Sequence, residues 1–172
     1  MFPNRLYWRR RTVVNVVIDE QLRNFLEHGV SMHLGTRTAK LEPNGARVTA
    51  LAVEPGGEHI IVYVPDAQMA AVSADLATHA PVAVACARPQ DDRACQLKGS
   101  VVEVRPAGAA EYDLVVRQWE GLRQQLETVG IPREATRTWV VWPSTAVRVR
   151  VTAVFDQTPG PNAGARITGA GA

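Results

Sequence analysis

Hydrophobic and polar residues alternate in short runs along most of the chain, the pattern of half-buried β-strands. Turn-forming sequences rich in Gly, Pro and Asn follow the first two runs, at residues 42–46 and 54–58. Residues 81–87 are apolar without interruption, which predicts a strand buried on both faces. The alternating runs, each of which predicts a strand, are residues 30–35, 46–53, 59–64, 95–104 and 147–155.

Two short helices are expected between these strands. Residues 18–29 begin with Asp19, whose carboxylate can accept from the free N–H groups of a first turn, and end at Gly29, which suits a left-handed stop. Residues 66–78 form the second, with Asp66 as its N-cap. The apolar positions that these helices would bury are Leu22, Phe25 and Leu26 in the first and Met69, Val72 and Leu76 in the second.

A third and longer helix is expected between Pro106 and Gly130. Three helices do not alternate with the strands as a doubly wound parallel sheet requires, so the pattern favours an α+β fold with a mainly antiparallel, barrel-like sheet. We expect a single domain over residues 1–172, with an N-terminal arm at 1–17 and an irregular tail at 157–172. The third helix would bury Leu114 or Val115, Trp119, Leu122 and Leu126.

Composition narrows the class of protein. Hydrophobic residues make up 46% of the 172 residues and charged residues 21%, which is typical of soluble globular domains and not of disordered or collagen-like chains. The longest uncharged apolar stretch, residues 80–87, is too short to cross a bilayer. The basic cluster at residues 9–11 precedes an apolar run without a small-residue cleavage site, so we expect no signal peptide and a cytoplasmic location.

Charge and the metal-binding residue types exclude two further classes. The net charge is only +2, from 19 basic and 17 acidic residues, so we expect no nucleic-acid partner. Cys86 and Cys95 lie in predicted strands, where burial as small unbridged hydrophobes is expected. The four histidines show no ligand spacing, which predicts no metal site.

Well-known catalytic and nucleotide-binding motifs are absent from the sequence. It contains no Gly-x-Gly-x-x-Gly fingerprint, no phosphate-binding Gly-x4-Gly-Lys-Ser/Thr loop and no Gly-x-Ser-x-Gly elbow. Trp139 and Trp142 lie in an irregular stretch before the last strand. They suit either the lining of a planar ligand or packing at a dimer seam, and both interpretations stay open.

The most informative feature is the order of several short segments. Together they resemble the pyridoxamine 5'-phosphate oxidase-like, FMN-binding split-barrel superfamily over residues 19–161. The resemblance implies a mainly antiparallel split β-barrel with peripheral helices, a homodimer, and FMN at the dimer interface. The segments are residues 47–52 (RVTALA), 60–65 (IIVYVP), 76–84 (LATHAPVAV), 93–104 (RACQLKGSVVEV) and 154–161 (VFDQTPGP).

The same resemblance implies a cofactor site. Arg47 matches an arginine that leads one strand and helps to hold the flavin, and Tyr63-Val64 match an aromatic and small pair beside the isoalloxazine. No residue is expected to act as a catalytic acid or base, because the flavin itself carries the redox chemistry. The cofactor-binding residues expected on this basis are Arg47, Val48, Thr49, Tyr63, Val64, Gln96, Lys98 and Trp142.

The chain also departs from the family pattern. Of the cations that the pattern provides for the phosphate, only Arg47 remains, and a phosphate carries roughly −1.5 to −2 charge that is costly to bury unpaired. Arg93, Lys98, Arg148 or Arg150 could compensate from new positions, or face solvent. The positions that have lost a family contact are Ala52, Met69, Ala70, Ala94 and Asp156.

Two functional hypotheses follow from the resemblance. The first is an FMN-dependent oxidoreductase acting on a small-molecule redox substrate. The second is a non-enzymatic split-barrel module that binds another planar ligand, such as haem or a deazaflavin, or none. Pyridoxamine 5'-phosphate oxidase activity itself is not expected, because the Arg-Leu-His-Asp-Arg signature for that substrate is absent.

Overall fold

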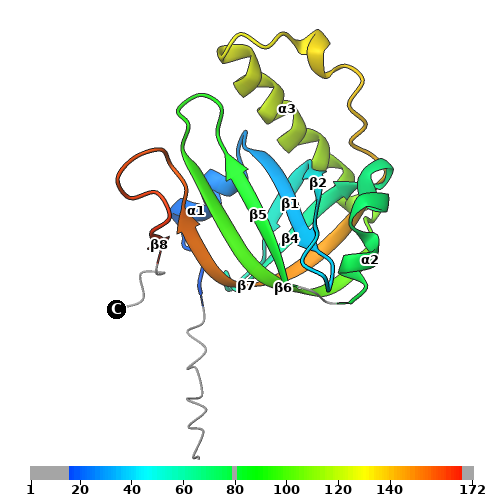
Figure 1. Cartoon of the computed structure of the whole chain (residues 1–172). Coiled ribbons are helices and arrows are strands. Elements are labelled where there is room, and N and C mark those ends of the chain that lie inside the picture. The colour runs from blue at the N-terminus through cyan, green and yellow to red at the C-terminus, as the bar shows by residue number, and fades with distance from the viewer. Residues whose placement is uncertain (1–15, 79–80, 168–172) are drawn as a thin grey trace, which may run out of the picture.

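A single antiparallel sheet dominates the computed structural model, which describes residues 16–78 and 81–167 (Figure 1). Its main path runs in the order β2-β1-β5-β6-β7-β4-β3, and the short β8 adds to one end of β7. The strands are β1 (Ser31–Arg37), β2 (Pro43–Val48), β3 (Ala50–Val53), β4 (His59–Pro65), β5 (Pro81–Ala87), β6 (Ala94–Pro106), β7 (Ser144–Asp156) and β8 (Arg166–Ile167).

The two ends of this strand order belong to one stretch of chain. β2 and β3 are consecutive parts of residues 43–53, yet β2 pairs with β1 and β3 pairs with β4. Thr49, between them, donates both its N–H and its hydroxyl to the carbonyl of Tyr63. Because one continuous segment joins both ends of the sheet, the sheet curls into a barrel. The α+β, mainly antiparallel split barrel expected from the sequence is confirmed.

The longest strands, β6 and β7, bend sharply where their pairing register shifts. The shifts fall between Lys98 and Gly99 and between Val101 and Glu103. A Cβ at Gly99 would lie 2.4 Å from the carbonyl oxygen of Arg150, so only glycine fits this crossing. Bulges of this kind increase local twist, which lets the two strands pass from one side of the barrel to the other.

Alternating side chains of all the main strands fill the barrel interior. Fully buried members include Leu34, Val48, Ile60, Leu97 and Val147, drawn from five different strands. A smaller apolar cluster lies outside the barrel, where α3 packs on β3, β4 and β7. Its buried members are Ala50, Tyr63, Val115 and Ala146.

The helices lie at the periphery, and α3 crosses one end of the barrel (Figure 1). Gln118 of α3 accepts from the N–H of Leu51 at 2.9 Å and donates to its carbonyl at 2.7 Å. This side chain thereby pairs with the edge of β3 as a neighbouring strand would. The helices are α1 (Glu20–Leu26), η1 (Asp66–Ala71), α2 (Ser73–Leu76), η2 (Ala109–Glu111), α3 (Tyr112–Thr128) and η3 (Arg133–Thr136).

The first and third expected helices are confirmed, and the second differs. Asp19 caps α1 by accepting from Leu22 N–H at 2.8 Å. Residues 66–78 contain the 3₁₀ helix η1 and the single turn α2 instead of one helix. Asp66 does not cap η1 through its side chain, because its carboxylate accepts from the hydroxyl of Thr145.

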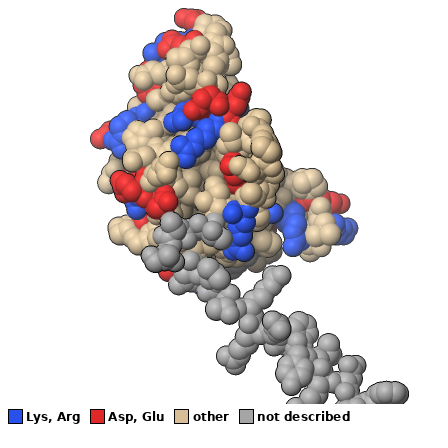
Figure 2. All heavy atoms as spheres, turned by 90° about the vertical axis from the view of Figure 1, so that its left-hand side faces the viewer, with Lys and Arg blue, Asp and Glu red and all other residues tan. Residues whose placement is uncertain are grey.

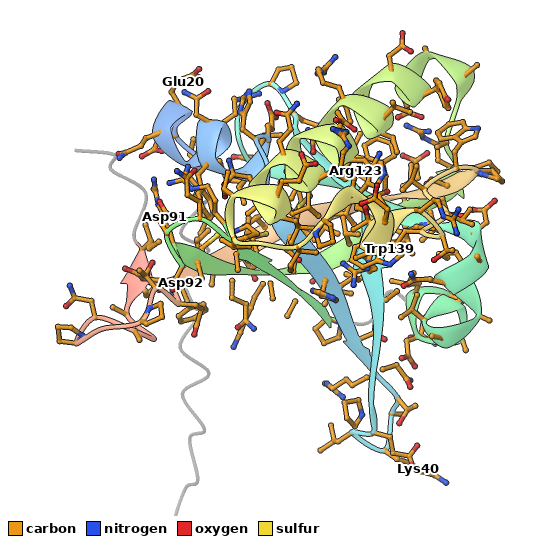
Figure 3. The ribbon with its side chains drawn as sticks, turned by 90° about the horizontal axis from the view of Figure 1, so that it is seen from above. Glu20, Lys40, Asp91, Asp92, Arg123 and Trp139 are labelled. Carbon is orange, nitrogen blue, oxygen red and sulfur yellow. The ribbon has the colours of Figure 1, made fainter. Side chains whose placement is uncertain are left out.

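Three strand predictions also need correction. The turn expected at residues 42–46 lies earlier, at 38–41, because the Thr38 hydroxyl accepts from Lys40 N–H and Glu42 N–H (Figure 3). The run 46–53 is divided at Thr49 rather than continuous. Residues 81–87 are buried on one face only. The other face carries alanines, which make the sequence of the strand apolar although that face is not buried.

Two surface properties complete the fold. Within residues 16–78 and 81–167, no helix is long and apolar enough to cross a membrane. On the face shown in Figure 2, basic and acidic side chains lie near one another in small groups. Several of these charges pair locally, as Arg23 does with Glu27 and Arg88 with Asp91.

Candidate functional site

A cross-strand row of side chains begins at Arg47 on the outer face of the sheet. Backbone pairing aligns Arg47 with His33, His33 with Ala85, Ala85 with Gln96, and Gln96 with Phe155. The chain neighbours of the first four residues belong to the interior core, so these four side chains point outward. The row places a cation at one end of an open face with small residues at its centre.

Arg47 is held in a fixed orientation by aromatic side chains. Its guanidinium carbon lies 3.9 Å from the centre of the Trp139 ring, a cation–π contact. Trp139 in turn lies 5.2 Å from Trp119 of α3, measured between ring centres. The backbone N–H of Arg47 donates to Gln68 of η1 at 2.7 Å. Trp139 is labelled in Figure 3.

The guanidinium of Arg47 differs from several others in the described part of the chain in having no carboxylate partner. Among the described residues, its guanidinium forms no ion pair and no hydrogen bond, although other arginines such as Arg105 and Arg148 pair with carboxylates. Burial lowers the pKa of Arg47 from its usual value. Desolvation, and secondly the charge of Arg47, lower the pKa of His33. The five N–H donors of a guanidinium suit a phosphate or carboxylate.

Two other expected site residues share the face of Arg47 but lie apart from it. Gln96 is three strands away in the same row, about 14 Å by ordinary strand spacing. Lys98, the next outward residue on β6, places its ammonium 4.8 Å from the centre of the Phe155 ring. These residues could contact the far end of an extended ligand, but not the anion bound at Arg47.

Three more of the expected residues lie inside the protomer. Val48, Thr49 and Val64 are buried, and the hydroxyl of Thr49 is used within the backbone junction described above. A ligand on the outer face would therefore not meet the side chains of Val48 and Val64, which belong to the interior core.

The remaining pair, Tyr63 and Trp142, belongs to the outer apolar cluster under α3. The hydroxyl of Tyr63 donates to Glu111 at 2.8 Å, and burial followed by this hydrogen bond raises the pKa of Tyr63. The Trp142 ring packs edge-on against Tyr112. Both aromatic residues are thus occupied by contacts within the chain.

The structure also adds residues that the sequence did not single out for the site. His33 and Gln68 reach Arg47 from β1 and η1. Trp139 was recognised as an aromatic residue of open role, and its role here is to support Arg47. No short sequence motif predicts these contacts. His33 could have been placed beside Arg47 only by knowing the register of the two strands that the 38–41 turn joins.

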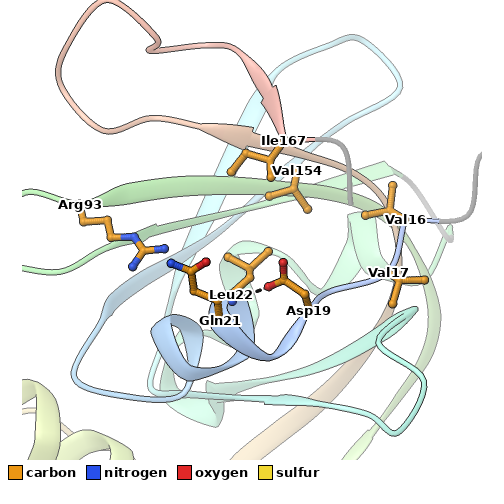
Figure 4. Close-up of a pocket in the computed structure, with 8 residues that line it drawn as sticks. All are labelled: Val16, Val17, Asp19, Gln21, Leu22, Arg93, Val154 and Ile167. Carbon is orange, nitrogen blue, oxygen red and sulfur yellow. Dashed lines mark hydrogen bonds between the residues drawn. The ribbon is translucent and has the colours of Figure 1, made fainter. Parts of the chain in front are cut away.

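The part of the chain that the structure describes also forms hollows away from Arg47. A cleft of about 480 Å³ separates α3 from the β5–β6 hairpin, with Arg88, Gln90, Arg117 and Gln124 in its walls. Its volume is in the range of small-molecule pockets. A smaller cavity of about 90 Å³ lies beside Asp19 and Arg93 (Figure 4). The described residues contain no group of three or more His, Cys, Asp and Glu side chains that could hold a metal ion.

Comparison with known proteins supports the fold. No protein-family model and no curated protein sequence matches the chain. Among solved structures, an F420 reductase aligns with a TM-score of 0.53 at 17% identity, over 77% of this chain and 94% of that one. HupZ of Group A Streptococcus aligns with a TM-score of 0.51 at 15% identity, over 86% and 100%.

A third structure carries the name of the superfamily. It is a Lactobacillus delbrueckii protein provisionally assigned as a pyridoxamine 5'-phosphate oxidase, with a TM-score of 0.50 at 13% identity, over 82% of this chain and 94% of that one. The chain has the fold of the pyridoxamine 5'-phosphate oxidase-like split barrels. The resemblance inferred from the sequence is therefore confirmed for the fold, and the activity of a split barrel has to be argued from its site.

Proposed function

We propose that this split barrel binds a phosphate-bearing flavin or deazaflavin on its outer sheet face and uses it to oxidise or reduce a small molecule. The observation that carries the proposal is the guanidinium of Arg47, which lies over the Trp139 ring and has no carboxylate partner among the described residues. A partly buried cation without a counter-ion is unfavourable in the free protein, and an anionic ligand would relieve it. FMN and the deazaflavin F420 both carry phosphate; FMN follows from the sequence resemblance, and F420 from the name of one structural neighbour.

The residues around Arg47 fit such a ligand in two respects. Arg47 would hold a phosphate oxygen pair, and its contact with Trp139 means that little side-chain freedom is lost on binding. Several outward positions near Arg47 are small: Gly45 and Gly35 form the next outward pair beside Arg47 and His33, and Ala85 lies beyond His33, so a ring system could lie over them. The bound cofactor would supply the redox chemistry, while this chain binds it, orients it and shields one side.

We propose further that the working form is a homodimer. The outer face around Ala85 is open, so one protomer would cover only one side of a planar ligand. A second copy placed on this face would exclude water from the other side. The surface near Arg47 is uncovered in a single chain. A second copy would exclude water there, which would strengthen the attraction between Arg47 and an anionic ligand.

Cofactor titration of the purified chain tests the proposal. We expect FMN or F420 to raise the melting temperature, because a ligand at 100 times its Kd stabilises the folded state by about 2.7 kcal/mol. Arg47→Ala removes charge-assisted hydrogen bonds and should weaken binding about 10- to 100-fold. Arg37→Ala is the matched control, because Arg37 lies on β1 near the same end of the sheet and is exposed.

The outcomes separate the alternatives. If neither cofactor changes the melting temperature or the absorbance spectrum, the proposed function is wrong. If a cofactor binds with equal affinity to the wild type and Arg47→Ala, the fold binds it but not through the site described here. Binding of haem alone would favour the non-enzymatic alternative.

A further inference from the structure

Two cysteines face each other inside the barrel, on the hairpin formed by β5 and β6. The strand register pairs Cys86 directly with Cys95. Both thiols are free, and the two residues are only 2% and 4% exposed. They point to the interior, opposite to the outer face that carries Ala85 and Gln96, so the proposed cofactor site does not use them.

The pairing geometry suits a covalent bridge. Directly opposed residues of an antiparallel pair have Cα atoms about 4.5–5.5 Å apart, and disulfides require about 4.4–6.8 Å. Arg88 N–H donates to Arg93 O. Cys86 and Cys95, two residues further along each strand, therefore form a hydrogen-bonded pair at the wide end of this range. An S–S bond is within reach of their Cα atoms but needs the two Cβ atoms to move slightly closer. The neighbouring Cys95 thiol, and secondly burial, raise the pKa of the Cys86 thiol.

We propose that Cys86 and Cys95 are a reversible dithiol–disulfide site that a small peroxide oxidises. One sulfur attacks a peroxide oxygen, the O–O bond breaks, and water leaves as that cysteine becomes a sulfenic acid. The second thiol then attacks the sulfenic sulfur, forming the S–S bond and releasing a second water. In sum, two thiols lose two electrons and two protons, and one hydrogen peroxide becomes two waters.

The bridge would act on the hairpin turn. It closes a loop over residues 87–94, and this loop provides Arg88 and Gln90 to the cleft under α3 and Arg93 to the cavity of Figure 4. Arg88 and Arg93 also both lie over the Phe25 ring of α1. Oxidation would therefore restrain a segment that borders both hollows and contacts α1.

Burial sets the kinetics of the reaction. The thiolate is the reactive form, and both cysteines are enclosed, so reaction should require transient opening of the hairpin end. A small oxidant should consequently react much faster than a bulky aromatic disulfide reagent. The same burial should protect the finished bridge from slow reductants, while dithiothreitol reverses it under mild denaturation.

Intact-mass spectrometry of the full chain after hydrogen peroxide treatment tests the proposal. The wild type should lose about 2 Da, and a peptide pair linked through Cys86 and Cys95 should appear before reduction. Its melting temperature should rise by several degrees and return after dithiothreitol. Cys86→Ala and Cys95→Ala serve as controls in which both changes disappear.

The contrary results are equally distinct. An unchanged mass, a gain of one or two oxygens without the linked peptide pair, or disulfides only between two chains would each overturn the proposal. The peptide map of the wild type decides the matter even if a cysteine variant fails to fold.

Discussion

At the scale of single residues, Glu111 joins three separate parts of the chain. Its carboxylate accepts two hydrogen bonds from Arg105, one from the hydroxyl of Tyr63 and one from the N–H of Gly108. The hydrogen bond from Arg105 is the largest cause that lowers the pKa of Glu111 from 4.5 to about 2, against the opposing effect of burial. The ionised form of the Glu111 carboxyl is therefore more favoured in the folded state than in the unfolded state.

This linkage predicts a pH dependence. A lowered pKa in the folded state contributes stability that is complete above pH 4.5 and is lost as the pH falls towards 2. Glu111→Gln should lower the free energy of unfolding by about 1–3 kcal/mol at neutral pH. The difference from the wild type should shrink below pH 4.5 in urea denaturation series. Glu134→Gln, on the exposed side of η3, should show no such trend.

The lack of space for a side chain at Gly99 gives a second prediction at this scale. The position of a Cβ there is blocked by the Arg150 carbonyl and by the Val149 side chain, at 2.4 and 2.5 Å. Gly99→Ala should destabilise the barrel by about 1–3 kcal/mol, because two strands would have to separate. Gly121→Ala in α3 is the control: a Cβ there would lie 3.5 Å from the backbone N of Gly29, an ordinary contact, so alanine should stabilise by about 0.5–1 kcal/mol. Equal effects of both substitutions in chemical denaturation would contradict this account of the bulge.

At the scale of elements, the edge of β3 is protected by side chains instead of a further strand. Gln118 satisfies both backbone groups of Leu51, and Glu27 accepts from the N–H of Val53. Arg23 donates to the carbonyl of Val53 at 2.8 Å. These contacts cover a sheet edge that would otherwise be free to pair with another chain.

Gln118 should therefore be the key polar residue of α3. Gln118→Ala leaves two buried backbone groups without partners and should cost about 1–3 kcal/mol in the free energy of unfolding. It should also increase aggregation on heating, since the β3 edge becomes available. Gln124→Ala, at an exposed position on the same helix, should be nearly neutral in both measurements. A neutral Gln118→Ala would mean that water replaces the side chain without loss.

The elements also show which features the sequence could predict. α1 was predictable because its cap and its stop, Asp19 and Gly29, lie within the helix's own sequence. The 66–78 helix was not, because its expected cap is bound by Thr145, which is 79 residues away. The outward face of β5 was misjudged because alanine suits either a buried or an exposed position.

At the scale of the whole molecule, closure of the barrel determines what the site can be. The sequence predicted Arg47 as an anchor, but its supports come from β1, η1 and the segment after η3, which only the folded barrel brings together. Gln96 was expected in the same site; it does share the outer face of the sheet, yet two strands lie between it and Arg47. A sequence pattern can predict which face of a sheet a residue lies on. The distance between two residues across the sheet depends on strand order, and strand order is set by pairing between segments that are far apart in the sequence.

The proposed homodimer gives the final prediction. Ala85 lies at the centre of the Arg47 row, between His33 and Gln96, and its side chain is exposed. Arginine at this position would add a second long cation to the row that already carries Arg47, and across a two-fold axis it would oppose its own copy. Ala85→Arg should therefore convert a dimer into a monomer in sedimentation velocity.

The matched control is Ala163→Arg, in the exposed turn before β8. It adds the same charge without approaching the sheet face, so it should leave the association state unchanged. Both variants should keep the circular dichroism spectrum of the wild type, because neither site is in a core. If the wild type is already monomeric, or if Ala85→Arg remains dimeric, the outer sheet face is not the interface. A cofactor bound there would then have to be shielded by this chain alone.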